Sequence, residues 1–260
     1  MKLTVLGVGL LGPGLADWNS GRALLHTPSA WQPAATVVLA PERLPTTERR
    51  RAGPLVKASI VVAGQALAAS GLDPAALPTV FTSSSGEPSN CHILFEALAT
   101  PERLVSPTRF TNSVHNTAAG YWHIATQSRA PSTSLAAFDA SFVAGLLEAA
   151  AQCLCCQGPV LLVACDLPYP EPLYGARSIP EVFATALVLA PAGHGRGLEL
   201  HISEPAEPSR CADAALQTLA RQIPAARALP LLCALAGAGA AELVLEDLGG
   251  MALRVKVLAA

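Results

Sequence analysis

The sequence predicts an α/β fold in which helices cover a central sheet, and three observations support this prediction. The 260 residues are 51% hydrophobic and only 14% charged, which provides enough apolar surface for a substantial core. Short apolar runs typical of strands alternate with longer segments in which apolar residues recur at helical spacing. One run, residues 159–164, is apolar throughout, as expected of a strand that is buried on both faces. Such a pattern favours a sheet layered between helices.

The N-terminal residues 3–8 predict the first strand, and a glycine-rich turn follows it. Lys2 and the apolar run after it would also fit a secretory signal peptide, but Pro13 and several glycines would break the helix that such a signal needs. The pattern Gly7-x-Gly9-x-x-Gly12 matches a dinucleotide-binding turn. That motif requires a helix directly after it, which Pro13 interrupts, so we expect no cofactor.

The next part of the chain predicts three helices and two strands. Residues 55–70 predict a helix that ends at Gly71, with Pro74 soon after it. Residues 91–99 and 116–126 predict two more helices, and the second is rich in small residues and so expected to be buried. The strands predicted by short apolar runs in this part are 78–82 and 132–137.

The second half begins with a long predicted helix over 140–156, because apolar side chains recur there with the helical period. The buried strand 159–164 follows it. Residues 182–190 and 198–203 predict a hairpin that is joined by a glycine-rich turn. The remaining predicted elements are a helix over 212–222 and strands near Leu231 and Leu253.

Composition excludes several classes of protein. The chain is too apolar to be disordered, and it lacks the repeats of a coiled coil or of collagen. Its net charge is −2, so we expect no nucleic-acid partner. Away from the N-terminus, no run of 18 apolar residues is without a helix-breaking residue, so we expect no membrane span.

The seven cysteines lie mostly in apolar runs, which favours a reducing, cytoplasmic environment over a disulfide framework. Cys153, Cys155 and Cys156 lack the spacing of a zinc motif, and we expect no metal. Among the histidines, His115 and His123 could pair with a carboxylate, although two partly buried, hydrogen-bonded histidines are the default interpretation. His194 lies in a glycine-rich turn, where a solvated position is expected.

The most informative stretch is 109–166, where a small-residue segment precedes a strand that leads into the long helix. The matching residues are Asn116, Ala119 and Gly120, and then Pro131, Ser132 and Ser134. This stretch resembles the N-terminal half of the β-ketoacyl synthases, the condensing enzymes of the thiolase fold. The resemblance covers about residues 1–205. It implies a thiolase-like layered α/β/α fold, truncated to the N-terminal half, with residues 206–260 as a reduced C-terminal remnant packed on the same domain.

The resemblance also implies where catalysis would occur. The family's nucleophilic cysteine begins the buried helix, and counting along the chain without gaps brings its position to Asp139. A helix N-terminus stabilises a thiolate, but it holds a carboxylate ionised and weakly nucleophilic. We therefore expect Asp139 to cap the helix. Gating of a partner's site and support of decarboxylation are the alternatives.

The family's two catalytic histidines belong to its second half, and no histidine follows His201 here. Without the cysteine and both histidines, a condensation has no visible nucleophile or oxyanion support. The resemblance therefore implies a chain-length-factor-like subunit that forms a heterodimer with a ketosynthase and shapes its acyl tunnel. The implied pathway is of the aryl polyene or type II fatty-acid kind, in which chains grow on an acyl carrier protein.

In this family the strand before the nucleophile lies at the dimer interface, which here is 132–137. The residues expected to line the tunnel or the interface are Ser134, Ala136, Phe138, Asp139 and Phe142. The two phenylalanines could equally be ordinary core aromatics. A basic cluster could face an acidic acyl carrier protein or could simply be a solvated helix face, and it comprises Arg49, Arg50, Arg51 and Lys57.

Two other functions remain open at this point. The chain could be an acyl thioester hydrolase or decarboxylase that uses Asp139 with His115 or His123. It could also be a scaffold that only stabilises its partner.

Overall fold

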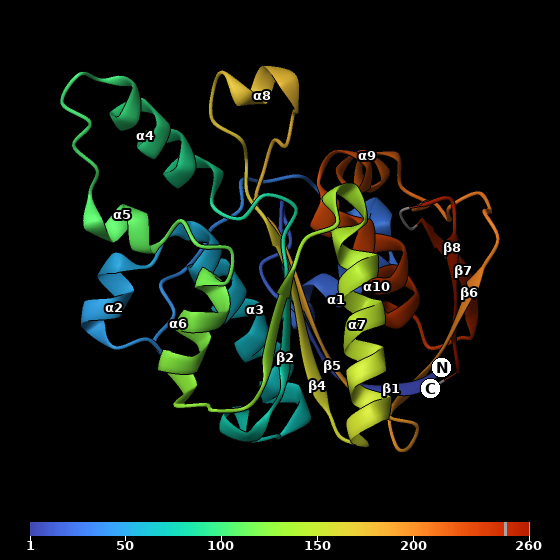
Figure 1. Ribbon diagram of the computed structural model, residues 1–260. Coiled ribbons are helices and arrows are strands. Elements are labelled where there is room, and N and C mark those ends of the chain that lie inside the picture. The colour runs from blue at the N-terminus through green and yellow to red at the C-terminus, as the bar shows by residue number, and fades with distance from the viewer. Residues whose placement is uncertain (247–248, 260) are drawn as a thin grey trace.

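The computed structural model describes residues 1–246 and 249–259, and within them one eight-stranded sheet lies between two layers of helices (Figure 1). The strands are β1 (Lys2–Leu11), β2 (Thr79–Thr82), β3 (Ser132–Leu135), β4 (Val160–Asp166), β5 (Phe183–Pro191), β6 (Arg196–Ser203), β7 (Ala241–Glu246) and β8 (Ala252–Val257). Their order across the sheet is β3-β2-β4-β5-β1-β6-β8-β7. β2 runs parallel to β3 and β4, and the other neighbours are antiparallel.

Helices cover both faces of this sheet. The α-helices are α1 (Trp18–His26), α2 (Thr46–Arg51), α3 (Pro54–Ser70), α4 (Pro88–Ala99), α5 (Pro107–Thr111), α6 (Thr117–Thr126), α7 (Ser141–Cys156), α8 (Leu173–Ala176), α9 (Ala214–Gln222) and α10 (Leu229–Ala236). Short 3₁₀ turns are η1 (Pro28–Ala30), η2 (Pro74–Ala76), η3 (Phe138–Ala140) and η4 (Pro224–Ala228). α3 and α6 lie on one face of the sheet, and α1, α7 and α10 lie on the other (Figure 1).

β4 is buried on both faces, as its uninterrupted apolar sequence predicts. Leu161 and Val163 belong to the apolar core under α3. Leu162 and Ala164 belong to the separate core under α7. The sheet is therefore the middle layer of an α/β/α arrangement, and the predicted fold class is confirmed.

The N-terminal glycines serve close packing between β1 and α3. A Cβ on Gly7 would lie 1.9 Å from the carbonyl oxygen of Ala66, and one on Gly9 would lie 2.0 Å from that of Val62. These positions are accordingly restricted to glycine, because both obstacles are backbone atoms. The next helix begins only at Trp18, with Asp17 as its N-cap. Gly7 and Gly9 of the three-glycine pattern thus have a packing role.

The prediction of a hairpin from residues 182–190 and 198–203 is wrong in its pairing. Both strands exist as β5 and β6, but β1 lies between them and pairs with each. The glycine-rich turn therefore crosses over β1, and the backbone N–H of Gly193 donates to Thr4 Oγ1 at 3.0 Å. Sequence proximity suggested direct pairing, whereas both edges of β1 carry backbone N–H and C=O groups that pair with β5 and β6.

The prediction of a strand near Leu231 is also wrong, because this segment forms α10. Leu231, Leu232 and Leu235 are all buried, so this short helix is apolar on most of its circumference. A short apolar run cannot be assigned to a strand or a buried helix from periodicity alone. Among the described α-helices and strands, five have no counterpart in the prediction: α1, α2, α5, α8 and β7. The helix 212–222 and the strand near Leu253 are confirmed as α9 and β8.

One segment within the described residues, Phe138–Cys156, is long and apolar enough to cross a membrane by length and composition. The sequence analysis predicted no such segment. Half of this segment is buried inside the protein. Phe142, Leu146 and Ala150 pack into the core against the sheet. We therefore interpret α7 as a core helix.

Candidate functional site

A sharp turn joins β3 to α7, and Phe138 lies at its apex. Its φ angle of +50° is in the left-handed region, which costs a residue other than glycine about 1–2 kcal/mol. Ser141 holds the turn: its Oγ accepts from the backbone N–H of Ala137 at 3.0 Å and donates to the carbonyl of Phe138 at 2.7 Å. We call residues 137–141 the elbow. Backbone strain of this kind concentrates at functional sites.

Asp139 does not cap the helix, so the capping prediction is wrong. Its carboxylate instead accepts from two arginines: Arg177 Nη2 donates to Oδ1, and Arg227 Nη2 donates to Oδ2 at 3.0 Å. Ala140 occupies the N-cap position of α7, and no side chain among the described residues caps that end. The charge-assisted pairs with two guanidinium groups replaced the capping interaction that we expected.

Arg177 connects the elbow to two other loops. Its guanidinium carbon lies 3.9 Å from the centroid of the Phe138 ring, a cation–π contact. Its Nη1 donates to Ser84 Oγ at 2.9 Å and to Tyr169 Oη at 3.3 Å. Arg177 follows α8, so this side chain fastens the segment between β4 and β5 over the elbow.

Arg227 connects the elbow to the C-terminal part of the sheet. Besides Asp139, it binds Glu246 of β7, with 3.0 Å between Nη1 and Oε2. We call Asp139, Arg177, Arg227 and Glu246 the Asp139 cluster. The side chains of both arginines are less than a quarter exposed, at 21% and 24%. The cluster is therefore partly shielded from water and joins η3, η4, β7 and the segment after α8.

Asp166, at the end of β4, is a buried carboxylate that the sequence analysis did not select. It accepts from Ser84 N at 2.7 Å, Ser83 Oγ at 3.1 Å and Ala225 N at 2.8 Å. Burial raises the pKa of Asp166 to about 7, while these hydrogen bonds and the charge of Arg177 oppose the increase. The signal in the sequence was an acidic residue directly after a fully apolar strand.

The five residues expected to line a tunnel or an interface fall into two groups. Phe142 is fully buried in the core, which agrees with the alternative that it is an ordinary core aromatic. Phe138 is 58% exposed, Ala136 is exposed, and Ser134 and Asp139 are half-buried. These four follow one another along β3 and the elbow, at the end of the sheet that β3 forms.

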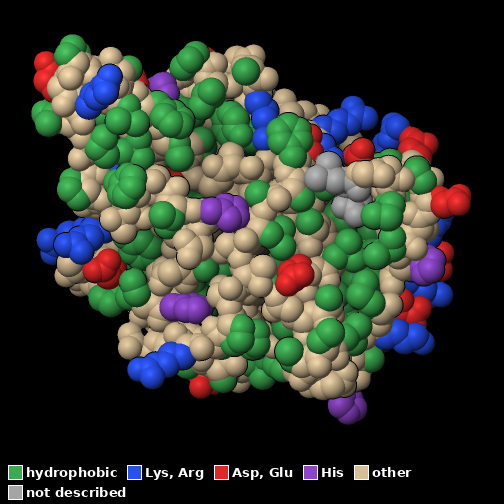
Figure 2. Space-filling model, in the orientation of Figure 1, with side chains coloured by type: hydrophobic (Ala, Val, Ile, Leu, Met, Phe, Trp, Pro, Cys, Tyr) green, Lys and Arg blue, Asp and Glu red, His purple; other side chains and the backbone are tan. Residues whose placement is uncertain are grey.

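β3 is an edge strand, because β2 is its sole neighbour in the described sheet. Its other edge presents backbone N–H and C=O groups that can pair with another chain. Exposed apolar side chains also lie on α4, α5, α6 and the segments that join them, and Figure 2 shows hydrophobic side chains gathered over α4 and α5. They are Ile93, Phe95, Leu98, Leu104, Phe110, Val114 and Ile124. Such a surface is typical of a protein–protein contact.

The two histidines considered for catalysis lie away from Asp139. His115 and His123 line a shallow cavity of about 450 Å³ together with Ser132 and Ser134. Asp139 is not among the residues that line it. His123 Nε2 is buried and has no hydrogen-bond partner in the described part of the chain. The Asp–His pair that an altered hydrolase or decarboxylase would need is therefore not assembled.

The basic cluster is also divided by the structure. The guanidinium of Arg49 donates to the backbone carbonyls of Glu42 and Leu44 at 2.8 and 2.9 Å, so Arg49 has a structural role. Arg50 and Arg51 are exposed and line a cavity of about 390 Å³ near the start of α3. Lys57 is half-buried. Two of the four residues are therefore clearly available to a partner.

Within the described residues, no group of three or more His, Cys, Asp or Glu side chains could hold a metal ion. All seven cysteines are free thiols. Cys153 is buried in α7, and burial raises the pKa of its thiol to about 11. This shift favours the protonated, unreactive form.

Residues 18–241 match the protein family described as "Beta-ketoacyl synthase, N-terminal domain". A comparison with curated proteins found no match. Among solved structures, one similar chain comes from the ketosynthase ApeO in complex with its chain length factor ApeC from Xenorhabdus doucetiae. The identity to that chain is 22%, the TM-score is 0.74, and the alignment covers 98% of this chain and 99% of the other.

Two further structures have the same fold. The ishigamide ketosynthase/chain length factor is 14% identical with a TM-score of 0.72, and the alignment covers 100% of both chains. The complex AntDE:AntF, a type II polyketide acyl-carrier protein with its ketosynthase bound to the hexaketide, is 13% identical with a TM-score of 0.77. The alignment covers 100% of this chain and 99% of that one. At these identities the likeness concerns the fold, which is that of thiolase-like ketosynthases.

Proposed function

The chain belongs to the β-ketoacyl synthase family, and from that premise we propose that it is a non-catalytic, chain-length-factor-like partner of a ketosynthase. One observation carries the proposal. The elbow, where the family's nucleophile begins the buried helix, presents Phe138 and an aspartate held by two arginines. A carboxylate engaged by two guanidinium groups is a poor nucleophile, and a phenyl ring is none. The elbow therefore has no group suited to hold an acyl chain covalently.

The exposed edge of β3 and the exposed apolar side chains on α4, α5 and α6 support a heterodimer with the ketosynthase subunit as occupant. A pairing partner would satisfy the backbone groups of the edge and bury the apolar surface. Two similar structures are of a ketosynthase with a chain length factor. In this proposal Ser134, Ala136, Phe138 and Asp139 lie at the subunit boundary, and Phe138 forms part of the wall of the acyl tunnel.

The proposal extends to the setting in which the heterodimer acts. Chain extension would take place on an acyl carrier protein, and one similar structure contains such a carrier with its ketosynthase. Arg50 and Arg51 are the exposed cations that could meet an acidic carrier. Free thiols agree with a cytoplasmic location. Residues 206–260 would be a reduced C-terminal part of the same domain, since β8 pairs with β6.

Co-expression with a ketosynthase encoded nearby tests the proposal. We expect the two chains to co-purify as a heterodimer, and we expect Ala136→Arg to abolish co-purification because it introduces a charge at the proposed contact. The matched control is Ile202→Arg on β6, which also replaces an exposed apolar side chain but lies far from β3 in the sheet order. A chain that never co-purifies with a ketosynthase, or that hydrolyses acyl thioesters alone, would contradict the proposal.

Product analysis of the complex tests the role in the tunnel. Phe138→Ala removes most of an exposed ring at the elbow, so we expect longer acyl products from the heterodimer. Ile202→Ala should leave the product length unchanged. Unchanged products from the Phe138 variant, with the complex intact, would reduce the role of this chain to that of a scaffold.

A further inference from the structure

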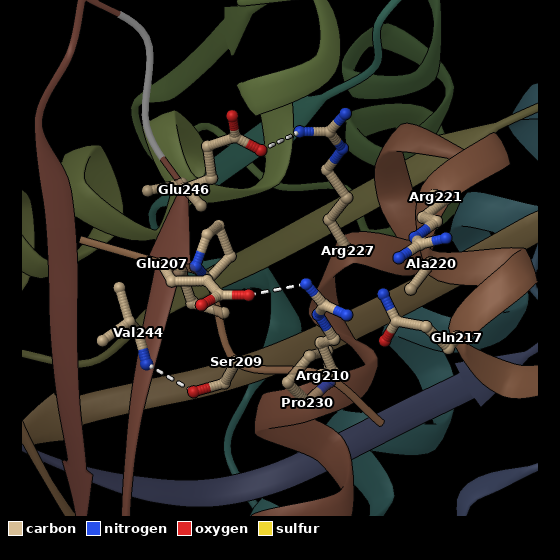
Figure 3. Close-up of a pocket in the computed structure, with 13 residues that line it drawn as sticks. Glu207, Ser209, Arg210, Gln217, Ala220, Arg221, Arg227, Pro230, Val244 and Glu246 are labelled. Atoms are coloured by element: carbon tan, nitrogen blue, oxygen red, sulfur yellow. Dashed lines mark hydrogen bonds and ion pairs between the residues drawn. The ribbon is translucent and has the colours of Figure 1, made fainter. Parts of the chain in front are cut away.

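A pocket lined by several arginines adjoins the Asp139 cluster. It lies between α9, η4, β7 and the segment that leads into α9 (Figure 3). Its volume is about 240 Å³, enough for a small molecule. Three arginines line it, namely Arg210, Arg221 and Arg227. The carboxylates among its lining residues are Glu207 and Glu246.

The three arginines differ in how far their charge is already compensated. Arg227 is bound by both Asp139 and Glu246. Among the described residues, Arg210 forms an ion pair only with Glu207. Both side chains are more than 60% exposed, so this ion pair contributes little to the stability of the fold. Arg221 forms no ion pair with any described residue. Positive charge that could serve a ligand therefore comes from Arg210 and Arg221.

A neutral donor lies beside these two guanidinium groups. Gln217 Oε1 accepts from the backbone N–H of Cys211 at 2.7 Å, which fixes the orientation of the amide. The amide nitrogen of Gln217 consequently remains as a donor on the pocket side. Figure 3 shows Arg210, Gln217 and Arg221 on the same side of the pocket. Two guanidinium groups and an amide N–H₂ match the oxygen atoms of a carboxylate or a phosphate.

The pocket lining also includes apolar side chains. Val143 of α7 and Leu245 of β7 are buried, while Ala220 lies beside Arg221 and Pro230 lies beside Arg210 (Figure 3). A pocket that combines apolar side chains with a few convergent donors suits a ligand with the same two parts.

We propose that this pocket binds a small organic oxyanion, a carboxylate or a phosphate monoester that carries a short apolar group. The oxyanion lies between Arg210, Arg221 and Gln217, and the apolar group lies against Val143 and Leu245. Arg227 is shared by this pocket and the Asp139 cluster, so a bound anion also changes the field at the elbow. This proposal does not rest on the role proposed for Phe138.

Isothermal titration calorimetry of the full-length chain at low ionic strength tests the site with three probes. Hexanoate supplies a carboxylate and an apolar chain, inorganic phosphate supplies the oxyanion alone, and 1-hexanol supplies the chain alone. We expect hexanoate to bind at least about tenfold more tightly than 1-hexanol, since the charge-assisted hydrogen bonds are lost with the alcohol. Phosphate binding stronger than hexanoate binding would assign the site to phosphate esters, and the reverse would assign it to carboxylates.

Variants locate the binding. Arg221→Ala and Arg210→Ala should each weaken hexanoate binding about tenfold. The matched control is Arg254→Ala on β8, an exposed arginine that lines a different pocket and should have no effect. Equal binding of hexanoate and 1-hexanol, binding of none of the probes, or an equal loss in the Arg254 variant would overturn the proposal. Because Arg210 is exposed, its variant remains informative even if the Arg221 variant does not fold.

Discussion

Asp139 carries one negative charge between two partly buried arginines, and this arrangement gives it a structural role. Without this charge the two positively charged guanidinium groups would repel each other. Water would screen the repulsion only in part, because each arginine side chain is less than a quarter exposed. Phe138 adds a second contact to Arg177 through its ring. At the residue scale, the elbow is held by charge and stacking where a reactive enzyme would keep a group unbound.

Replacing Asp139 should therefore cost stability. We expect Asp139→Ala to lower the free energy of unfolding by about 1–3 kcal/mol, less than for a fully buried pair because water screens the cluster in part. Urea denaturation measures this loss. Glu242→Ala, which breaks an exposed pair with Lys256, is the control and should cost about 0.5 kcal/mol or less. Equal effects of the two variants would show that the cluster does not stabilise the fold.

Asp166 predicts a dependence of stability on pH. Its pKa is about 7 in the folded chain, against 3.8 for an ordinary aspartate. Between these pH values the folded chain binds a proton that the unfolded chain has released, so the free energy of unfolding falls as the pH rises from about 4 to about 7. The stabilising contribution is complete below this window and lost above it.

Asp166→Asn removes the titration and isolates this contribution. We expect the difference in unfolding free energy between the natural chain and the variant to decrease by roughly 4 kcal/mol across that window. Denaturant titrations at several pH values measure it. The variant itself is expected to be less stable, because its amide N–H₂ would face the donors Ser84 N or Ala225 N. A difference that does not change with pH would contradict the prediction.

At the scale of elements, the contact between β1 and α3 depends on glycine. The backbones approach so closely at Gly9 that a methyl group would overlap the carbonyl oxygen of Val62. Gly64, on α3 itself, has no atom within 4 Å of an added Cβ. The two glycines therefore have different roles: Gly9 permits the close packing of β1 on α3, whereas Gly64 lies outside that contact and only lowers helix propensity.

Substitution by alanine should separate these roles. Gly9→Ala should destabilise the chain by about 1–3 kcal/mol or more, because β1 and α3 must move apart. Gly64→Ala should stabilise it by about 0.5–1 kcal/mol, since alanine favours the helix. Thermal and urea unfolding of both variants measure the effects. A tolerated alanine at position 9 would mean that the strand and helix can separate without loss of packing.

At the scale of the whole molecule, the sheet has two edges of different character. β7 closes one end after two antiparallel neighbours, β6 and β8. β3 forms the other end, is short, and runs directly into the elbow. The proposed partner surface and the altered elbow are therefore adjacent in the fold. In the proposed heterodimer, Phe138 would lie at the subunit boundary.

Much of the fold was predictable because its causes are local. The strand β4 is apolar throughout, α7 has the helical period, and α3 ends at a glycine with a φ of +68°. Errors arose where local signals are ambiguous. The apolar run of α10 fits a strand or a buried helix equally well, and only packing in the core decides between them.

The sequence by itself determined the α/β class, the doubly buried central strand and the resemblance to condensing enzymes, since composition and periodicity depend on neighbouring residues. Only the tertiary structure decided which residues the side chains of Asp139 and Asp166 bind. The partners of Asp139 lie 38 and 88 positions away in the chain, and Ala225, which binds Asp166, is 59 positions away. Ion pairs and hydrogen bonds across such separations have no periodic signature, because they form only when the layers of the fold bring distant segments together.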